Sequence, residues 1–343
     1  MKTKILSIIM ASLILMSVFT ININIYADNS DYLLEEYAEN NEFLKAIGIY
    51  DDDFNENAKA VLSRGEFIHY AFRLLNYNAQ PVEQSPFWDL KPDYEYYKSV
   101  ANAYMCGIVN GYADGSVGVY KSIKVEDAIG ILVRILGYEN FVNEAYTYPD
   151  GVHKLGVRLK LVDNLSFEEE LTYSGMSALL KRVLRTPVME QTVFGDKEDF
   201  DNSEDVTLLS QNFDIYFIEG IVTSDQISSL SKYDEVNLGK IKILDTTINM
   251  DYSGIRYLGY YVECWYKCEN NSKTNELVYI NPVNNDVTTI LDEQFDLVVD
   301  NTIKYYINNK EKRVKTNFAT VYIYNGKKID YTTEFNEELF KGE

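Results

Sequence analysis

Histidine and cysteine, the side chains that build most metal and nucleophilic sites, are scarce in this chain of 343 residues. The two histidines are His69 and His153, so the part of the chain beyond His153 cannot hold a Ser-His-Asp or Cys-His catalytic site of its own. Cys264 and Cys268 lie in one predicted strand, about 13 Å apart, which is too far for a disulfide bond. Cys106 ends an apolar helix face, where we expect it in the core. We therefore expect no disulfide framework, no metal centre and no cofactor.

Basic residues are also few, 32 against 53 acidic ones, and the formal net charge is −21. This balance excludes nucleic acid as a partner, because phosphate binding needs a basic surface. Walker and dinucleotide-binding loops are absent as well. An anionic polymer needs a local cationic site that acts against the overall field. Carboxylates are plentiful, so composition leaves a glycosidase-type pair of acids open, although nothing in the pattern marks any two of them.

Long uncharged apolar stretches are absent except at the N-terminus. Two lysines precede an apolar run over 5–19, and Ile25-Tyr26-Ala27 is an imperfect cleavage site. Residues 1–27 are therefore predicted to be a signal peptide, and the mature protein is predicted to be secreted. The alternative is an uncleaved membrane anchor, since the uncharged run continues to Tyr26, but the asparagines at 22 and 24 weaken a membrane span.

One sequence pattern that is present is a helical face of apolar residues with the spacing i, i+3, i+4, i+7, i+8. It occurs three times, beginning at Phe67, Ala128 and Met176. Each copy begins one residue after the same position of a four-residue helix start, and this common phase indicates an internal repeat. Each repeat is a helix pair that cannot bury its apolar face alone, so we expect the three to pack together.

The stretch over 103–138 carries the clearest motif, a helix end, a glycine-rich loop over 111–116 and a second helix from about Val125. Together with Phe87-Trp88-Asp89-Leu90 before it, this stretch resembles the S-layer homology (SLH) family. The helix start that the family writes as Thr-Arg-Ala-Glu stands here as the segments 63–66, 124–127 and 172–175, of which only the first keeps an arginine. The resemblance covers residues 28–78, 87–140 and, in degenerate form, 146–190.

That resemblance implies a compact pseudo-threefold helical bundle with ligand grooves between neighbouring repeats. It also implies a cell-surface protein of Gram-positive, clostridial type, attached noncovalently to the cell wall or S-layer. The implied partner is an anionic, typically pyruvylated, secondary cell-wall polysaccharide linked to peptidoglycan, with other S-layer proteins as further partners. Neither nucleic acid nor, after signal cleavage, membrane is expected as a partner.

The candidate site centres on Arg64, because a cation at a helix N-terminus is mildly unfavourable and is better explained by a ligand. Ser63 and Glu66 also fit a capping box, which is a structural role. The remaining residues shape the groove or replace missing arginines, and loop amides and the helix start supply further donors. The predicted ligand-binding set is Ser63, Arg64, Glu66, Asp89, Gly111, Asp114, Gly115, Lys121 and Lys124.

Beyond a predicted linker over 191–208, the hydrophobic period changes to 2. Residues 209–343 are predicted to form an antiparallel β domain, a small barrel or sandwich, so the fold class is α+β with two kinds of domain. Its tyrosines at 257, 260, 261 and 266 fit cross-strand packing better than a carbohydrate platform. The predicted strands are 214–222, 240–248, 255–268, 276–280, 286–291, 302–307 and 320–324.

Three functional readings follow, of which the leading one is a non-enzymatic wall-bound surface protein. The first alternative is a carbohydrate-active enzyme in the β domain that the repeats anchor. The second is a set of degenerate repeats that serve surface assembly alone. A calcium loop at Asp51-x-Asp53-x-Asn55 is disfavoured, because Glu56 stands where such loops need glycine and Leu62 where they need glutamate.

Overall fold

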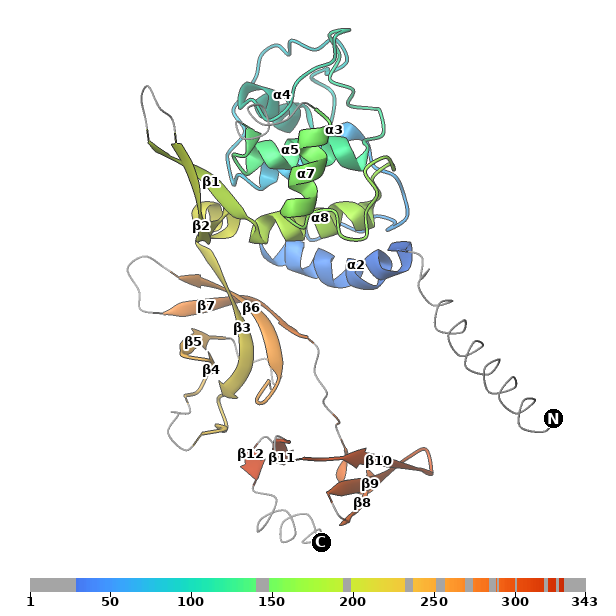
Figure 1. Ribbon diagram of the computed structural model, residues 1–343, viewed down its shortest axis with the longest axis vertical. Helices are drawn as coiled ribbons and strands as arrows, with labels where there is room; N and C mark the ends of the chain where they lie inside the picture. Colours follow the sequence, from blue (N-terminus) through green and yellow to red (C-terminus); the bar gives the residue numbers. More distant parts are fainter. Residues whose placement is uncertain are drawn as a thin grey trace, which may run out of the picture. The chain divides into compact units, whose positions relative to one another are not determined.

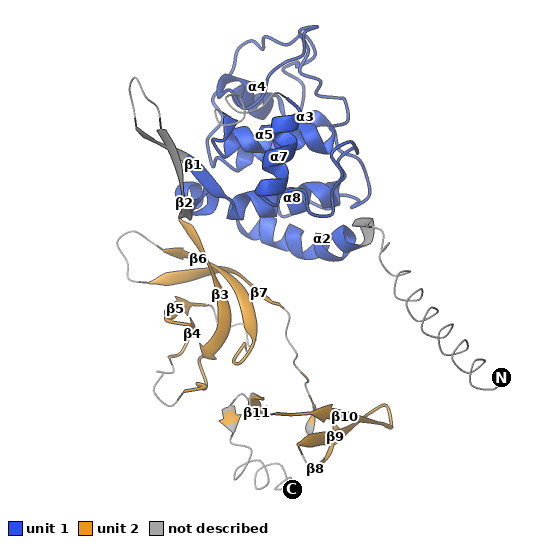
Figure 2. Ribbon diagram, viewed as in Figure 1, with its two compact units in different colours: residues 1–213 blue, residues 214–343 orange. Residues whose placement is uncertain are grey.

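The chain is a mixed α and β protein that divides into two compact units at Phe213 (Figure 2). The coarse prediction of helices with several antiparallel sheets is confirmed. The predicted signal peptide lies outside the described residues. The computed structural model describes residues 29–139, 148–193, 199–231, 237–250, 257–268, 274–283, 288, 290–299, 301–317, 320–324 and 327–329.

Unit 1, residues up to 213, contains the helices (Figure 1). Helix α3 begins at the capping box, in which the Ser63 hydroxyl accepts from Glu66 N and the Glu66 carboxylate accepts from Ser63 N. Among the described residues, no helix is both long and apolar enough to cross a membrane. The helices are α2 (Asn29–Ala46), α3 (Arg64–Arg73), α4 (Tyr97–Met105), α5 (Val125–Ile135), α7 (Asp150–Arg158), α8 (Tyr173–Arg185) and α9 (Leu208–Phe213).

The helices pack in neighbouring pairs that cross the boundaries of the predicted repeats. Helix α4 packs against α3, α7 against α5, and α2 along α8, as the ribbon also shows (Figure 1). The α2–α8 contact joins the two ends of the helical segment. It includes a buried polar chain in which Ser177 bonds to the Tyr50 hydroxyl at 2.9 Å and to Asn41 Oδ1 at 2.8 Å. Helix α2 thus covers α8, which brings together helices from opposite ends of the predicted repeats.

A ring of backbone hydrogen bonds joins the starts of α3, α5 and α8. The first two amides of each of these helices donate to the loop that precedes the next one. Those amides have no partner inside their own helix, so the neighbouring loop satisfies them. The six bonds are Arg64 N to Lys121 O, Gly65 N to Val119 O, Val125 N to Glu169 O, Glu126 N to Phe167 O, Tyr173 N to Ala60 O and Ser174 N to Ala58 O.

The centre of this ring is apolar. Leu62, Ile123 and Leu171 occupy the same position before the three helix starts, and each is at most 1% exposed. Leu62 N donates to Leu171 O, and Leu171 N donates to Ile123 O. Because the contacts run from each helix start to the next, removal of one start leaves unpaired donors and acceptors on both neighbours.

The segment predicted as a linker, 191–208, is instead largely secondary structure. Strand β1 (Pro187–Val193) pairs antiparallel with β2 (Asp199–Thr207), and helix α9 follows at once. The polar, acidic composition of the segment concealed this hairpin. The boundary between the units therefore falls at Phe213, a few residues beyond the predicted linker.

Unit 2, residues 214–343, begins with a closed five-stranded barrel. Around the barrel the order is β3-β4-β5-β7-β6, and β6 returns to pair with β3. Strands β5 and β7 are parallel, so the prediction of a purely antiparallel domain is wrong at this one contact. A five-stranded barrel of this kind resembles the OB type of Greek-key barrel. The strands are β3 (Ile215–Ser224), β4 (Lys240–Ile243), β5 (Thr246–Asn249), β6 (Tyr261–Cys268) and β7 (Asn275–Pro282).

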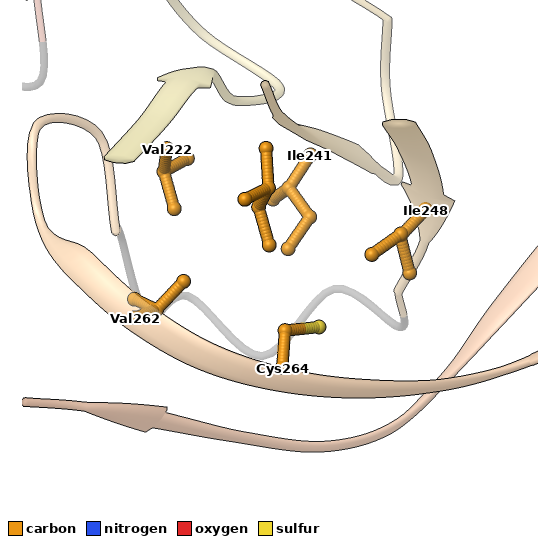
Figure 3. Close-up of a cluster of buried hydrophobic side chains, with 6 residues drawn as sticks. Val222, Ile241, Ile248, Val262 and Cys264 are labelled. Atoms are coloured by element: carbon orange, nitrogen blue, oxygen red, sulfur yellow. The ribbon is translucent and has the colours of Figure 1, made fainter. Parts of the chain in front are cut away.

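Alternate residues of the barrel strands point inward and form one apolar core. Figure 3 shows Val222, Ile241, Ile248, Val262 and Cys264 facing one another across the interior. All five are at most 2% exposed. Cys264 therefore serves as a small apolar side chain of this core.

Two smaller sheets follow the barrel. The first has the order β10-β9-β8, with Ile303 as its buried residue, and the second is the β11–β12 pair. Their elements are the 3-10 helix η1 (Asp292–Gln294) and the strands β8 (Phe295–Val299), β9 (Thr302–Ile307), β10 (Lys310–Lys315), β11 (Tyr322–Tyr324) and β12 (Lys327–Ile329).

Candidate functional site

Arg64, the first residue of α3, lies under the loop that precedes α5. Its Nε donates to Val117 O at 3.1 Å, and its guanidinium carbon lies 5.4 Å from the centre of the Tyr112 ring. Nη1 lies 3.9 Å from Asp127 Oδ2, and the Arg64 side chain is 9% exposed. Neither terminal nitrogen donates a hydrogen bond to a residue that the structure describes. The fold therefore uses Nε for a hydrogen bond and places Nη1 beside the Asp127 carboxylate, while the terminal N–H groups keep unused hydrogen-bonding capacity.

Lys121 brings a second cation to the same ring. Its Nζ lies 4.6 Å from the centre of the Tyr112 ring. Gly118 permits this approach, because a Cβ there would lie 2.8 Å from the Tyr112 ring and φ is +76°. Tyr112 itself is 41% exposed. The Tyr112 ring thus brings together two cations, the buried Arg64 and the exposed Lys121, in a strongly acidic chain.

Asp89 holds the loop that carries these groups. Its Oδ1 accepts from Val117 N at 2.8 Å, and its Oδ2 accepts from Gly118 N at 2.7 Å and from Val119 N at 3.3 Å. One carboxylate therefore occupies three amides of the loop that precedes α5. Asp89 belongs to the site as a positioning residue and does not face a ligand through these oxygens.

The turn over 111–116 adds an exposed aromatic side chain. Trp88 is 60% exposed, and its Nε1 donates to Asp114 O at 3.1 Å. Asp114 closes the turn by accepting from Ser116 N and the Ser116 hydroxyl, which lowers its pKa, and Gly115 has φ +80°. Gly111 lies against Phe87, where a Cβ would clash with the ring. These residues shape the turn and hold Trp88 at the surface.

Ser63 and Glu66 have structural roles. Besides the capping box, Glu66 Oε1 accepts from the Tyr173 hydroxyl at 2.7 Å. Both Glu66 oxygens are therefore bonded within the protein. The capping box expected for Ser63 and Glu66 is present, and Glu66 makes a further bond within the protein.

Lys124 contacts carboxylates and not the Tyr112 ring. Its Nζ is 3.2 Å from Glu168 Oε2 and 3.8 Å from Glu126 Oε1, and the hydrogen bond to Glu168 raises its pKa. Two carboxylates neutralise this cation. Of the two lysines expected to replace missing arginines, only Lys121 joins Arg64.

The start of α3 does not offer free amides to an anion. The amides of Arg64 and Gly65 donate to carbonyls of the neighbouring loop, and Glu66 N donates to the Ser63 hydroxyl. The expectation that this helix start supplies ligand donors is therefore wrong. At this helix start, side chains and not amides remain for a ligand.

Tyr112, Trp88 and Asp127 were missed as candidate residues by sequence reasoning. The first two belong to the motifs quoted above, and their exposure was the property that sequence could not supply. No cluster of three metal-ligating side chains occurs in the part of the chain that the structure describes. All three cysteines have free thiols, and Cys106 is exposed, contrary to the expectation that it lies in the core.

Comparison with known proteins gives no family for this chain. No model of a known protein family matches it, and no curated protein matches it.

Proposed function

We propose that the protein is an exported, non-enzymatic surface protein that binds an anionic cell-wall polysaccharide through unit 1. One observation carries the proposal: Arg64 and Lys121 approach the same exposed ring, Tyr112, at 5.4 and 4.6 Å in a chain of net charge −21. Acidic residues dominate the chain, so a local pair of cations favours an acidic ligand, which competes with Asp127 for Arg64.

The ligand class follows from the combination of cations and aromatic rings. The terminal nitrogens of Arg64 and the Lys121 ammonium form charge-assisted hydrogen bonds with a sugar carboxylate, such as that of a pyruvyl group. Trp88 and Tyr112 offer apolar faces, 60% and 41% exposed, to the C–H surface of a sugar ring. A polymer that lacks acidic groups can contact the aromatic faces but cannot form the charge-assisted hydrogen bonds.

Unit 1 in this proposal contains three SLH-like repeats, α2 with α3, α4 with α5 and α7 with α8, which pack together through the contacts α3–α4, α5–α7 and α2–α8. In this proposal the ring of bonds between the three helix starts is the pseudo-threefold centre, and the grooves lie between neighbouring repeats. Val125 and Tyr173 stand where the first repeat has Arg64. Binding is therefore centred on one groove and is weaker than three intact sites give.

Cosedimentation with cell-wall sacculi, with and without their secondary polysaccharide, tests the proposal on the full chain. Retention is expected on complete sacculi and is lost on stripped ones. Equal retention on both overturns polymer binding. Absence of retention on both favours the alternative in which degenerate repeats serve assembly alone.

Lys121→Ala tests the assignment of the residues, with Lys124→Ala as its matched control. Loss of a charge-assisted bond of about 1.5–3 kcal/mol predicts roughly 10- to 100-fold weaker retention for Lys121→Ala. Lys124→Ala retains binding, because that lysine pairs with Glu168 and Glu126. Equal effects of the two substitutions contradict the assignment. Both lysines are exposed, so neither change is expected to unfold the protein.

A further inference from the structure

The loop that leaves strand β3 contains a buried carboxylate with one unsatisfied oxygen. Asp225 follows Ser224, the last residue of β3, and is 3% exposed. Ile227 N and Ser228 N both donate to its Oδ1 at 2.8 Å. The second oxygen, Oδ2, is buried and has no hydrogen-bond partner. The backbone turn thus fixes the carboxylate while leaving half of it unpaired.

The next residue, Gln226, also has a buried oxygen, Oε1, without a hydrogen-bond partner. A buried carboxylate oxygen without a donor or counter-ion is costly, and native proteins satisfy such groups with bound water or ions. Two neighbouring residues therefore each present a bare oxygen inside the same loop.

Lys328 contacts this loop but does not bond to the unpaired oxygen of Asp225. Lys328, on β12, donates from Nζ to Leu230 O at 2.8 Å and from its backbone N to the Ser228 hydroxyl. Among the described residues, no ion pair to Asp225 is formed. The contrast with unit 1 is clear, because there Asp51 receives two hydrogen bonds from Arg73 at 3.0 and 2.9 Å.

We propose that Asp225 Oδ2 and Gln226 Oε1 are ligands of a bound calcium ion in the β3–β4 loop. The donor set contains only oxygen, which selects a hard cation, and calcium accepts neutral amide oxygens and irregular geometry more readily than magnesium does. Water completes the coordination. A single carboxylate places the dissociation constant at about 10⁻⁴–10⁻³ M, as in weak extracellular calcium sites. This site does not depend on the polysaccharide site of unit 1.

Hydrogen exchange of the amides over 222–231 in the full chain tests calcium binding, because a bound ion stabilises the loop against opening. In about 5 mM CaCl₂, roughly ten times the expected dissociation constant, exchange of these amides is expected to slow about tenfold relative to EDTA. Asp225→Asn abolishes this difference, although the asparagine still offers one oxygen to Ile227 N and Ser228 N. Asp245→Asn, in the exposed turn between β4 and β5, retains it.

Several results overturn the proposal. Identical exchange in CaCl₂ and EDTA means that the oxygens bind water only, or that a flipped Gln226 amide donates to Asp225. A calcium effect that survives Asp225→Asn means that calcium acts elsewhere on this acidic chain. If magnesium slows exchange as strongly as calcium, the site is not selective in the way proposed.

Discussion

The hydroxyl of Tyr173 donates a hydrogen bond of 2.7 Å to Oε1 of Glu66. Tyr173 is the first residue of α8, and Glu66 is the third residue of α3. Arg64 and Asp127 occupy the same two positions on α3 and α5, with 3.9 Å between Nη1 and Oδ2. Thus the first side chain of α3 meets a carboxylate on α5, and the first side chain of α8 meets a carboxylate on α3. Arg64 therefore has a structural contact as well as the proposed contact with a ligand.

Tyr173→Phe is expected to lower the free energy of unfolding of unit 1 by about 1–2 kcal/mol, because Glu66 loses a partner at a half-buried position. Denaturant unfolding followed by circular dichroism measures this loss. Tyr120→Phe is the control, since Tyr120 is 70% exposed and its hydroxyl has no such role. Polysaccharide retention is expected to be unchanged in both variants. If Tyr173→Phe loses as much retention as Lys121→Ala, Tyr173 contributes to binding and its purely structural role is wrong.

Asp89 is expected to affect stability and binding together. Asp89→Ala removes the acceptor for the amides of Val117, Gly118 and Val119, which predicts a loss of about 2–3 kcal/mol and a displaced loop. Asp89→Asn keeps one acceptor oxygen, so its loss should be smaller. Retention on sacculi and unfolding are measured in parallel. If Asp89→Ala weakens retention without loss of stability, Asp89 faces the ligand and the positioning role is wrong.

Helix positions could be predicted from the sequence, but the partners of the helices could not. The apolar faces that begin at Phe67, Ala128 and Met176 all belong to helices, because a stripe of period 3.6 must be buried. The neighbours α2 and α8 are joined through Asn41, Ser177 and other residues far apart in sequence. The bonds between helix starts use backbone carbonyls, which leave no trace in a pattern of side chains.

The candidate site was predictable only in part, because the sequence pattern does not show which side chains meet in the folded chain. Lys121 and Lys124 are three residues apart and look alike in sequence, yet one meets Tyr112 and the other meets Glu168. Asp89 was predicted at the groove, but its three amide partners depend on how two loops meet. Exposure and pairing are tertiary properties, so they separate these residues only in the folded chain.

Strand prediction was wrong where the side-chain pattern does not reveal the backbone pairing. Strand β10 contains five charged residues in six and was not predicted, yet it pairs with β9 along its whole length. Charged side chains are common on an edge strand, where they discourage pairing with other chains. The predicted strand over 286–291 has no strand at its described residues 288, 290 and 291, and β8 lies at Phe295–Val299 instead.

The thiols of Cys106 and Cys264 are expected to react at very different rates. Cys106 is exposed, whereas Cys264 is buried in the barrel core and burial raises its pKa to about 12. The thiolate is the reactive form, so Cys264 should react with a thiol reagent only after unfolding. Mass spectrometry of alkylated peptides measures both rates. Labelling of Cys264 as fast as that of Cys106 in the native protein contradicts the closed barrel.

His69 is expected to make the stability of unit 1 depend on pH. Burial, with a smaller effect of the nearby Arg73 charge, lowers the pKa of His69 to about 4. Its Nδ1 bonds to the Ser99 hydroxyl at 2.9 Å, and its ring stacks on Tyr96. In the unfolded chain a histidine has a pKa of about 6.5, so between pH 6.5 and about 4 the unfolded state binds a proton that the folded state does not.

The contribution of His69 is therefore fully present above pH 6.5 and is lost as the pH falls toward about 4. Linkage sets its upper limit at about 3 kcal/mol. His69→Gln preserves a hydrogen-bonding group beside Ser99 but cannot titrate. Denaturant unfolding at intervals from pH 7 to 4 should show a steeper decline for the native chain than for His69→Gln. The acidic residues contribute equally to both proteins, so the difference isolates this imidazole. Parallel pH profiles mean that His69 accepts its proton in the folded state, and that the stacked, buried environment beside Tyr96 opens in solution.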